Sequence, residues 1–194
     1  MQYLKGIESY QDSRPSAVTL GKFDGLHRGH EMLIQRIMKH QQEDQVVGIV
    51  CAFDMSAFWK KQNKEPDFLM TSEEKAKRLD GRIDYFVDCP FDEAISSMEA
   101  EMFIKDILVE QFHANYIVVG DDFRFGYQKK GDYHMLQEYG LLYDYQVEVI
   151  QKTCYQGREI SRSYIKEELK KGNLELADYL LGYNYQNNRK NGEE

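Results

Sequence analysis

The chain has 194 residues, 42% of them hydrophobic and 13% aromatic, which fits one globular domain with an ample core and excludes a disordered chain. A formal net charge of −8 argues against non-specific nucleic-acid binding, because that binding requires a basic face. The sequence has no basic-then-apolar leader, no apolar run near the ~20 residues of a membrane span, and three dispersed cysteines, so we expect a cytoplasmic protein with buried, reduced thiols and no membrane partner. Residues 1–15 are a polar lead-in, in which Tyr3 and Leu4 indicate an edge strand.

The stretch AVTLGKFDGLHRGH, residues 17–30, combines a strand, a tight turn and the start of a helix. An apolar, β-favouring run ends at Gly21, and a second glycine, Gly25, provides the turn. The helix is expected over about residues 29–42, with one apolar face made of Leu33, Ile34, Ile37 and Met38. Free N–H groups and the positive end of the helix dipole make such a helix start an anion-binding site.

His27 and His30 are spaced as His-x-Gly-His around Gly29 at this helix start. Two imidazoles three residues apart can face one ligand, each with an N–H donor, and the glycine lets a phosphate approach the backbone. The alternative is that both are surface histidines without a ligand. Their position after a strand and a glycine turn favours the phosphate site.

The rest of the chain alternates strand and helix patterns. Strands are expected at residues 45–53, 83–89, 116–120 and 145–150. Helices are expected from a capping box at residues 71–74 through Leu79, and at residues 97–112, 133–139, 161–171 and from Asn173 onward. A small hairpin is expected at Gln156 and Gly157, residues 54–66 are expected to be irregular, and residues 121–132 connect a predicted strand to the next helix.

Five strand patterns separated by helices predict an α/β fold, a doubly wound parallel sheet. Ligands of such sheets lie beyond the carboxyl ends of the strands. Residues 21–24, 53–54 and 120–125 all follow predicted strands, so we expect them to converge on one site. We assign residues 1–185 to one domain and expect the polar residues 186–194 to be a disordered tail.

The motif TLGKFDGLHRGH resembles the opening motif of nucleotidyltransferases, and most of all that of the FMN adenylyltransferase (FAD synthetase) module of bacterial bifunctional riboflavin kinase/FAD synthetases. The resemblance extends over about residues 17–185. It implies a Rossmann-like fold and the transfer of adenylate from ATP to FMN, with Mg²⁺, giving FAD and pyrophosphate. In the bifunctional proteins a riboflavin kinase barrel begins just beyond the position that corresponds to residue 185. We therefore expect no kinase activity from the sequence given.

VVGDDFRFG, residues 118–126, resembles the G-[ED]-D-F-R-F-G segment of the same family. Its carboxylates can accept hydrogen bonds from a base or ribose, and its rings can stack on a flavin or purine. The alternative is that Phe123 and Phe125 plug the core from a loop.

ISRSYIK, residues 160–166, stands where the family has I-S-S-T-x-x-R, a second phosphate clamp. Lys166 replaces the family's arginine, which is not a conservative exchange because only arginine offers phosphate two parallel donors. AFDMSA, residues 52–57, keeps a phenylalanine and an acid of the family's T-F-x-P-H-P loop but loses both prolines and the histidine. Lys22 stands where the family usually has asparagine.

The resemblance assigns residues to three groups. The catalytic residues are His27, His30 and Lys166. The ATP-binding residues are Gly21, Lys22, Phe23, Asp24, Gly25, Gly29, Gly120, Asp122, Ser161, Arg162 and Ser163. The flavin-binding residues are Asp54, Phe58, Trp59, Phe123, Arg124 and Phe125. Because the flavin-side loop departs from the family pattern, a nucleotidyltransferase with a different phosphate-ester acceptor stays open as an alternative, and so does a non-catalytic nucleotide- or flavin-binding module.

Overall fold

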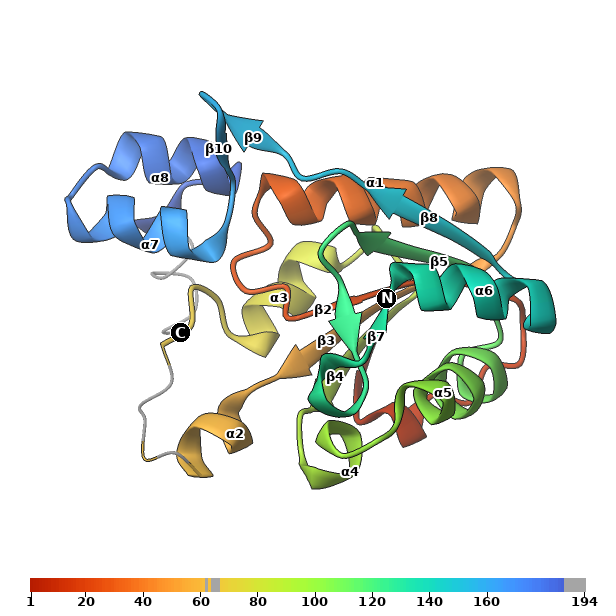
Figure 1. The fold of residues 1–194 in the computed structure, drawn as a ribbon. Helices are drawn as coiled ribbons and strands as arrows, with labels where there is room; N and C mark the ends of the chain where they lie inside the picture. Colours follow the sequence, from red (N-terminus) through yellow and green to blue (C-terminus); the bar gives the residue numbers. More distant parts are fainter. Residues whose placement is uncertain (62, 64–66, 187–194) are drawn as a thin grey trace.

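The computed structural model describes residues 1–61, 63 and 67–186 and is built on a six-stranded sheet in which all strands are parallel (Figure 1). The strands follow one another across the sheet in the order β1 (Gln2–Lys5), β4 (Tyr85–Pro90), β3 (Val47–Asp54), β2 (Ser16–Gly21), β5 (Ala114–Gly120) and β8 (Gln146–Ile150). The predicted doubly wound sheet is confirmed, and the edge strand expected at Tyr3 and Leu4 is its sixth member. Residues 187–194 of the expected tail lie outside the described residues.

The strand order shows where along the sheet a ligand is expected to bind. From β2 the chain builds outward through β3 and β4 on one side, and later through β5 and β8 on the other. The direction of winding therefore reverses between β2 and β5, which is where ligands of doubly wound sheets bind. Both strands are buried along most of their length, since helices cover both faces.

Helices lie on both faces of the sheet (Figure 1), and each face packs into an apolar cluster. On one face, α1 (Arg28–Glu43) and α3 (Ser72–Leu79) pack Ile34, Ile37 and Leu79 against Val50 and Phe86. The other face is covered by α5 (Ala100–Met102), the π-helix η2 (Phe103–Gln111) that continues it, and α6 (Tyr133–Tyr143). Residues alternate between the two layers along each strand, as the pleat of a sheet requires.

Several local expectations were wrong or incomplete. A short helix, α2 (Ser56–Lys61), occupies part of the expected irregular segment, and the Asp54 carboxylate accepts hydrogen bonds from the backbone N–H (2.9 Å) and hydroxyl (2.6 Å) of Ser56 at its start. The long helix begins at Ala100, after the separate turn α4 (Glu93–Ser96), and most of it is π-helical. Between β5 and α6 the chain forms a hairpin of β6 (Arg124–Phe125) and β7 (Gly131–Asp132), joined by the 3₁₀ turn η3 (Tyr127–Lys129).

The C-terminal part forms a small third cluster beside the start of α1 (Figure 1). The expected hairpin is present as β9 (Cys154–Tyr155) and β10 (Arg158–Glu159), followed by α7 (Arg162–Lys170) and α8 (Leu174–Leu181). Asn173 precedes α8 but does not cap it, because its side-chain amide donates to Glu168 instead (2.9 Å).

Two remaining expectations concern the cysteines and the membrane. Cys51 and Cys89 are buried free thiols on β3 and β4, as expected, whereas Cys154 is exposed because it lies in the two-residue strand of the small hairpin. None of the described helices is long and apolar enough to cross a membrane.

Candidate active site

The turn between β2 and α1 has a left-handed backbone at three positions. Phe23, Gly25 and Leu26 have φ angles of 47°, 84° and 40°. At Gly25 a Cβ would also lie 3.0 Å from the side chain of Leu69, so glycine meets both the conformational and the steric demand. The Gly25 carbonyl accepts a hydrogen bond from the Tyr183 hydroxyl (2.8 Å). This turn aims the N-terminus of α1 at the carboxyl edge of the sheet.

His27 and His30 lie in contact at the start of α1. Their rings stack with centroids 3.8 Å apart, and the Phe23 ring lies 5.0 Å from that of His30. Burial lowers the pKa of His27 to about 4, and burial together with the nearby charges of His27 and Lys75 lowers the pKa of His30 well below its usual value. Both rings are therefore neutral near pH 7, and each carries one N–H donor. The Nδ1 atoms of both are buried and have no hydrogen-bond partner among the described residues.

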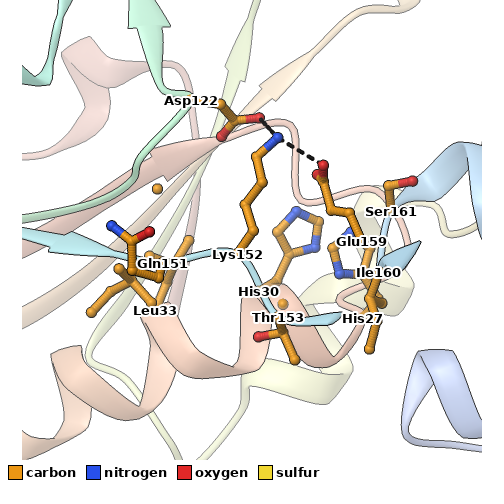
Figure 2. Close-up of a pocket in the computed structure, with 13 residues that line it drawn as sticks. His27, His30, Leu33, Asp122, Gln151, Lys152, Thr153, Glu159, Ile160 and Ser161 are labelled. Atoms are coloured by element: carbon orange, nitrogen blue, oxygen red, sulfur yellow. Dashed lines mark hydrogen bonds and ion pairs between the residues drawn. The ribbon is translucent and has the colours of Figure 1, made fainter. Parts of the chain in front are cut away.

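A cavity of about 230 Å³ opens beside these histidines (Figure 2). It lies between the start of α1, the ends of β5 and β8, and the β9–β10 hairpin. Its lining residues are His27, Gly29, His30, Leu33, Gly120, Asp122, Ile150, Gln151, Lys152, Thr153, Glu159, Ile160 and Ser161. The three sequence motifs thus meet in one cavity at the point where the strand order reverses.

Four polar lining residues were missed by the sequence analysis: Gln151, Lys152, Thr153 and Glu159. They belong to the connection after β8 and to the small hairpin. In the sequence they are ordinary polar loop residues, and only the topology brings them next to α1. The Lys152 ammonium group forms ion pairs with Glu159 (2.8 Å) and Asp122 (3.1 Å) across the cavity (Figure 2).

Eight residues assigned to catalysis or ATP binding do not line this cavity: Gly21, Lys22, Phe23, Gly25, Asp24, Arg162, Ser163 and Lys166. Phe23 is fully buried and supports the His30 ring, while Lys22 and Ser163 are exposed. Ser161, which does line the cavity, also accepts a hydrogen bond from the Tyr164 N–H (3.4 Å) and caps α7.

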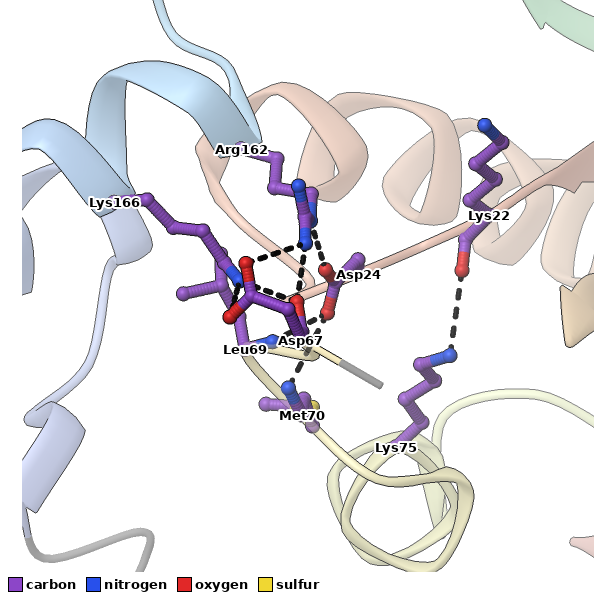
Figure 3. Close-up of polar contacts among 8 residues, drawn as sticks. All are labelled: Lys22, Asp24, Asp67, Leu69, Met70, Lys75, Arg162 and Lys166. Atoms are coloured by element: carbon purple, nitrogen blue, oxygen red, sulfur yellow. Dashed lines mark hydrogen bonds and ion pairs between the residues drawn. The ribbon is translucent and has the colours of Figure 1, made fainter. Parts of the chain in front are cut away.

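Asp24 is buried at the centre of a polar network (Figure 3). One of its carboxylate oxygens accepts from the backbone N–H groups of Leu69 (2.8 Å) and Met70 (3.3 Å), and the other accepts from Arg162 Nε (2.5 Å). Arg162 also bonds the Asp67 carbonyl. Asp24 therefore joins the β2–α1 turn to the segment before α3 and to α7.

Lys166 takes part in the same network (Figure 3) and is not among the residues that line the cavity. Its ammonium group contacts both the carbonyl and the carboxylate of Asp67. The hydrogen bond from Lys166, followed by the charges of Lys166 and Arg162, lowers the pKa of the Asp67 carboxyl. Both cations of the ISRSYIK motif are thus paired with carboxylates in this structure.

The aromatic residues assigned to the flavin side belong to two groups. Aromatic rings form a chain from Phe58 through Phe91, Phe53, Phe103 and Phe125 to Phe123, with successive centroids 5.5–6.3 Å apart. Phe125 is buried, as the core-plug alternative requires, and Arg124 forms an ion pair with Asp132 (2.7 Å).

Trp59 lies in the second group. Its ring is 4.8 Å from that of Phe68, and the Arg162 guanidinium stands 5.8 Å from its centroid. Trp59 therefore approaches the Asp24 network rather than the aromatic chain.

A second cavity, of about 270 Å³, lies at the carboxyl ends of β1, β3 and β4. Its lining residues are Lys5, Asp54, Ser56, Phe68, Met70, Thr71, Ser72, Glu73, Lys75 and Asp88. Lys75 is only 3% exposed and donates to the Lys22 carbonyl (3.3 Å); burial lowers its pKa and raises that of Asp88. Asp54 is the one predicted flavin-side residue in this lining.

Comparison with known proteins agrees with this geometry. The family model for FAD synthetase matches residues 9–164. The bifunctional riboflavin kinase/FMN adenylyltransferase of Buchnera aphidicola subsp. Schizaphis graminum is 33% identical over 186 residues, and that of Escherichia coli strain K12 is 32% identical over 189. Each alignment covers 94% of this chain, which spans 60% of the length of either relative.

The fold is also seen in a solved structure. A crystal structure described as a macrolide-efflux protein from Streptococcus pneumoniae superposes with a TM-score of 0.80 at 22% identity, covering 94% of this chain and 62% of that one. At that identity the likeness concerns the fold alone. The family model, in contrast, covers most of the chain and includes the strand–turn–helix unit with both histidines, the GDDFRFG segment and the start of α7. The chain belongs to the FAD synthetase family.

Proposed function

We propose that this protein transfers the adenylyl group of ATP to FMN, giving FAD and pyrophosphate. The observation that carries the proposal is the meeting of His27, His30, Gly120, Asp122 and Ser161 in one cavity at the sheet's switch point. Membership of the FAD synthetase family supports it. The alignments with relatives named bifunctional riboflavin kinase/FMN adenylyltransferase support it as well. A cytoplasmic location is part of the same proposal.

In the proposed reaction an oxygen of the FMN phosphate attacks the α-phosphorus of ATP in line with the leaving group. The new P–O bond forms as the bond to the β-phosphate breaks, and the electron pair leaves with pyrophosphate. No covalent enzyme intermediate is needed, so the protein contributes positioning and charge stabilisation. Neutral His27 and His30 donate N–H bonds to the phosphate oxygens, and the N–H groups at the start of α1 add their dipole.

The nucleotide is assigned to the first cavity. Gly29 and Gly120 allow its close approach, and Asp122 offers an acceptor for its base or ribose. Magnesium bound to the ATP phosphates, whose oxygens are ligands that it prefers, would neutralise part of their charge. Ser161 and Ser163 at the start of α7 hold the β- and γ-phosphates, together with Arg162 and Lys166 once these exchange Asp67 for phosphate.

The flavin is assigned to the side of the sheet end formed by Asp54, α2 and residues 123–125. Phe58 and Phe123 are the partly exposed ends of the aromatic chain and offer faces on which an isoalloxazine ring can stack. Gly21, Lys22, Phe23, Asp24 and Gly25 act on the site indirectly, by fixing the turn that carries both histidines.

The test is product analysis. Incubation with ATP, Mg²⁺ and FMN should give FAD and pyrophosphate in equal amounts, whereas the His27→Ala/His30→Ala double variant should not. The exposed His134 provides the matched control, and His134→Ala should behave as wild type. A different adenylylated ester would favour another phosphate-ester acceptor. ATP binding without pyrophosphate release would favour a non-catalytic module.

A further inference from the structure

Lys152 is the one lysine or arginine side chain among the described residues that line the nucleotide cavity. Its ammonium group lies 2.8 Å from a carboxylate oxygen of Glu159 and 3.1 Å from one of Asp122 (Figure 2). Hydrogen bonds to these two carboxylates raise the pKa of Lys152 above its usual value, so the group is charged at neutral pH. The cavity therefore already contains a full positive charge.

Two other basic side chains near the site, those of Arg162 and Lys166, are held by carboxylates. Arg162 neutralises the buried Asp24, and removing one partner of such a buried pair is costly. Lys166 is held by both the carbonyl and the carboxylate of Asp67, outside the cavity lining. These two cations must move before they can meet a phosphate, whereas Lys152 does not.

Lys152 can readily exchange its two carboxylate partners for another anion. The side chains of Asp122 and Glu159 are 65% and 42% exposed, and ion pairs with exposed partners contribute at most about 1 kcal/mol. A phosphate oxygen offers the ammonium group an equally charged acceptor, and a polyphosphate offers several. Giving up its two carboxylate contacts therefore costs Lys152 little.

Lys152 also faces the features that recognise phosphate. It shares the cavity with His30, Gly29 and Ser161, at the positive end of the α1 dipole. Both histidines are neutral, and Asp122 and Glu159 are acidic, so Lys152 is the one full positive charge that the described lining residues offer a polyphosphate. We propose that Lys152 is a phosphate-binding residue, which exchanges Asp122 and Glu159 for oxygens of the nucleotide's phosphate chain and so favours a triphosphate over a monophosphate.

This proposal rests on the proposed function only in taking ATP as the ligand, so binding is measured without FMN. Titrations with ATP and with AMP compare wild type, Lys152→Ala and Lys152→Arg. Loss of a charge-assisted hydrogen bond should weaken ATP binding about tenfold or more in Lys152→Ala, while AMP binding changes less than about twofold. Lys152→Arg should restore most of the ATP affinity, since it keeps the charge.

Glu159→Gln provides the sharpest readout. It removes a competitor for Lys152, so ATP binding should become tighter by about twofold to fivefold, which matches the ≤1 kcal/mol of an exposed ion pair. If Lys152 only holds the β9–β10 hairpin to Asp122, Glu159→Gln should instead weaken ATP binding, because it would loosen the hairpin. The proposal is overturned if ATP and AMP lose affinity equally in Lys152→Ala, if Glu159→Gln weakens ATP binding, or if the wild-type protein does not bind ATP.

Lys171 is the matched control. Its ammonium group also pairs with two carboxylates, those of Glu167 (2.6 Å) and Glu168 (2.9 Å), but it does not line the cavity. Lys171→Ala should leave ATP and AMP binding unchanged, and thermal unfolding of all variants checks that they fold. Selective loss of ATP affinity in a protein that makes no FAD would support Lys152 and refute the proposed function, so the two failures are distinguishable.

Discussion

The imidazole rings of His27 and His30 stack with their centroids 3.8 Å apart and their planes 19° from parallel. Two charged imidazolium ions this close would repel strongly, so the contact itself requires that at least one ring is neutral. Burial lowers the pKa of both. The site thus presents two uncharged donors side by side, at a helix start where negative charge is favoured.

His30→Ala should lower turnover far more than it weakens ATP binding. Donors of this kind act most strongly as charge develops in the transition state, and loss of one typically costs about 3 kcal/mol, or roughly a hundredfold to a thousandfold in rate. The measurement is kcat for FAD formation beside the Kd for ATP, with His134→Ala as control. Turnover within about threefold of wild type would rule out the donor role.

Acid should destabilise the protein through His27. The unfolded chain takes up a proton near pH 6.5, whereas the folded protein does so only near pH 4. The contribution of His27 to the free energy of unfolding should therefore stay constant above pH 6.5. It should fall by up to about 3 kcal/mol as the pH drops from 6.5 to 4. Urea unfolding of wild type and His27→Gln across this range tests the expectation. The variant should show a smaller loss, and parallel curves for the two proteins would contradict the assignment.

Lys166→Ala should impair adenylyl transfer, and Lys166→Arg should preserve it or raise it by up to about tenfold, because a guanidinium can offer phosphate two parallel N–H bonds. Asp67→Asn should retain activity, since it weakens the contact that holds Lys166 away from the cavity. Steady-state pyrophosphate release with ATP and FMN compares the four proteins. If Lys166→Ala matches wild type, the residue does not bind phosphate. If Asp67→Asn lowers activity as much as Lys166→Ala does, the Lys166–Asp67 ion pair has a structural role and Lys166 does not act on phosphate.

Asp24→Ala should destabilise the fold. It removes the acceptor for the backbone N–H groups of Leu69 and Met70 and the carboxylate that pairs with Arg162. The expected loss is about 3 kcal/mol in the free energy of unfolding. Asp80 is the control, because its exposed carboxylate pairs only with the chain's amino group (3.3 Å) among the contacts described for it, and Asp80→Ala should cost less than about 1 kcal/mol. Equal losses would show that the Asp24 network contributes no special stability.

Much of the fold could be predicted from the sequence, because its elements carry strong local signals. Leu33, Ile34 and Ile37 repeat with the period of α1, and Thr71 with Glu74 forms the capping box that starts α3. The π-helical stretch was not predictable, since Phe103, Ile104 and Leu108 suit one buried face with either helical spacing. Likewise, α2 depends on hydrogen bonds from Ser56 to Asp54, which carry no periodic pattern.

The site was predictable where its residues lie within a motif. His27, Gly29, Gly120, Asp122 and Ser161 all line the cavity. Lys152 and Glu159 follow no motif, and they reach the site only because β8 lies beside β5.

Two other placements also depend on tertiary contacts. Asp24 lies within a motif, yet its partners Leu69, Met70 and Arg162 come from distant segments that no local pattern connects. Lys75 shows the same limit, because a lysine inside a helix resembles a surface residue until the sheet end covers it.

Adenylyl transfer to FMN is measured by incubating the purified protein with ATP, Mg²⁺ and FMN and separating the flavins by chromatography. FAD should appear with one pyrophosphate per molecule, and the His27→Ala/His30→Ala variant should form none above the uncatalysed background. Pyrophosphate release without FAD, or no reaction in a folded protein that binds both ligands, would contradict adenylyl transfer to FMN.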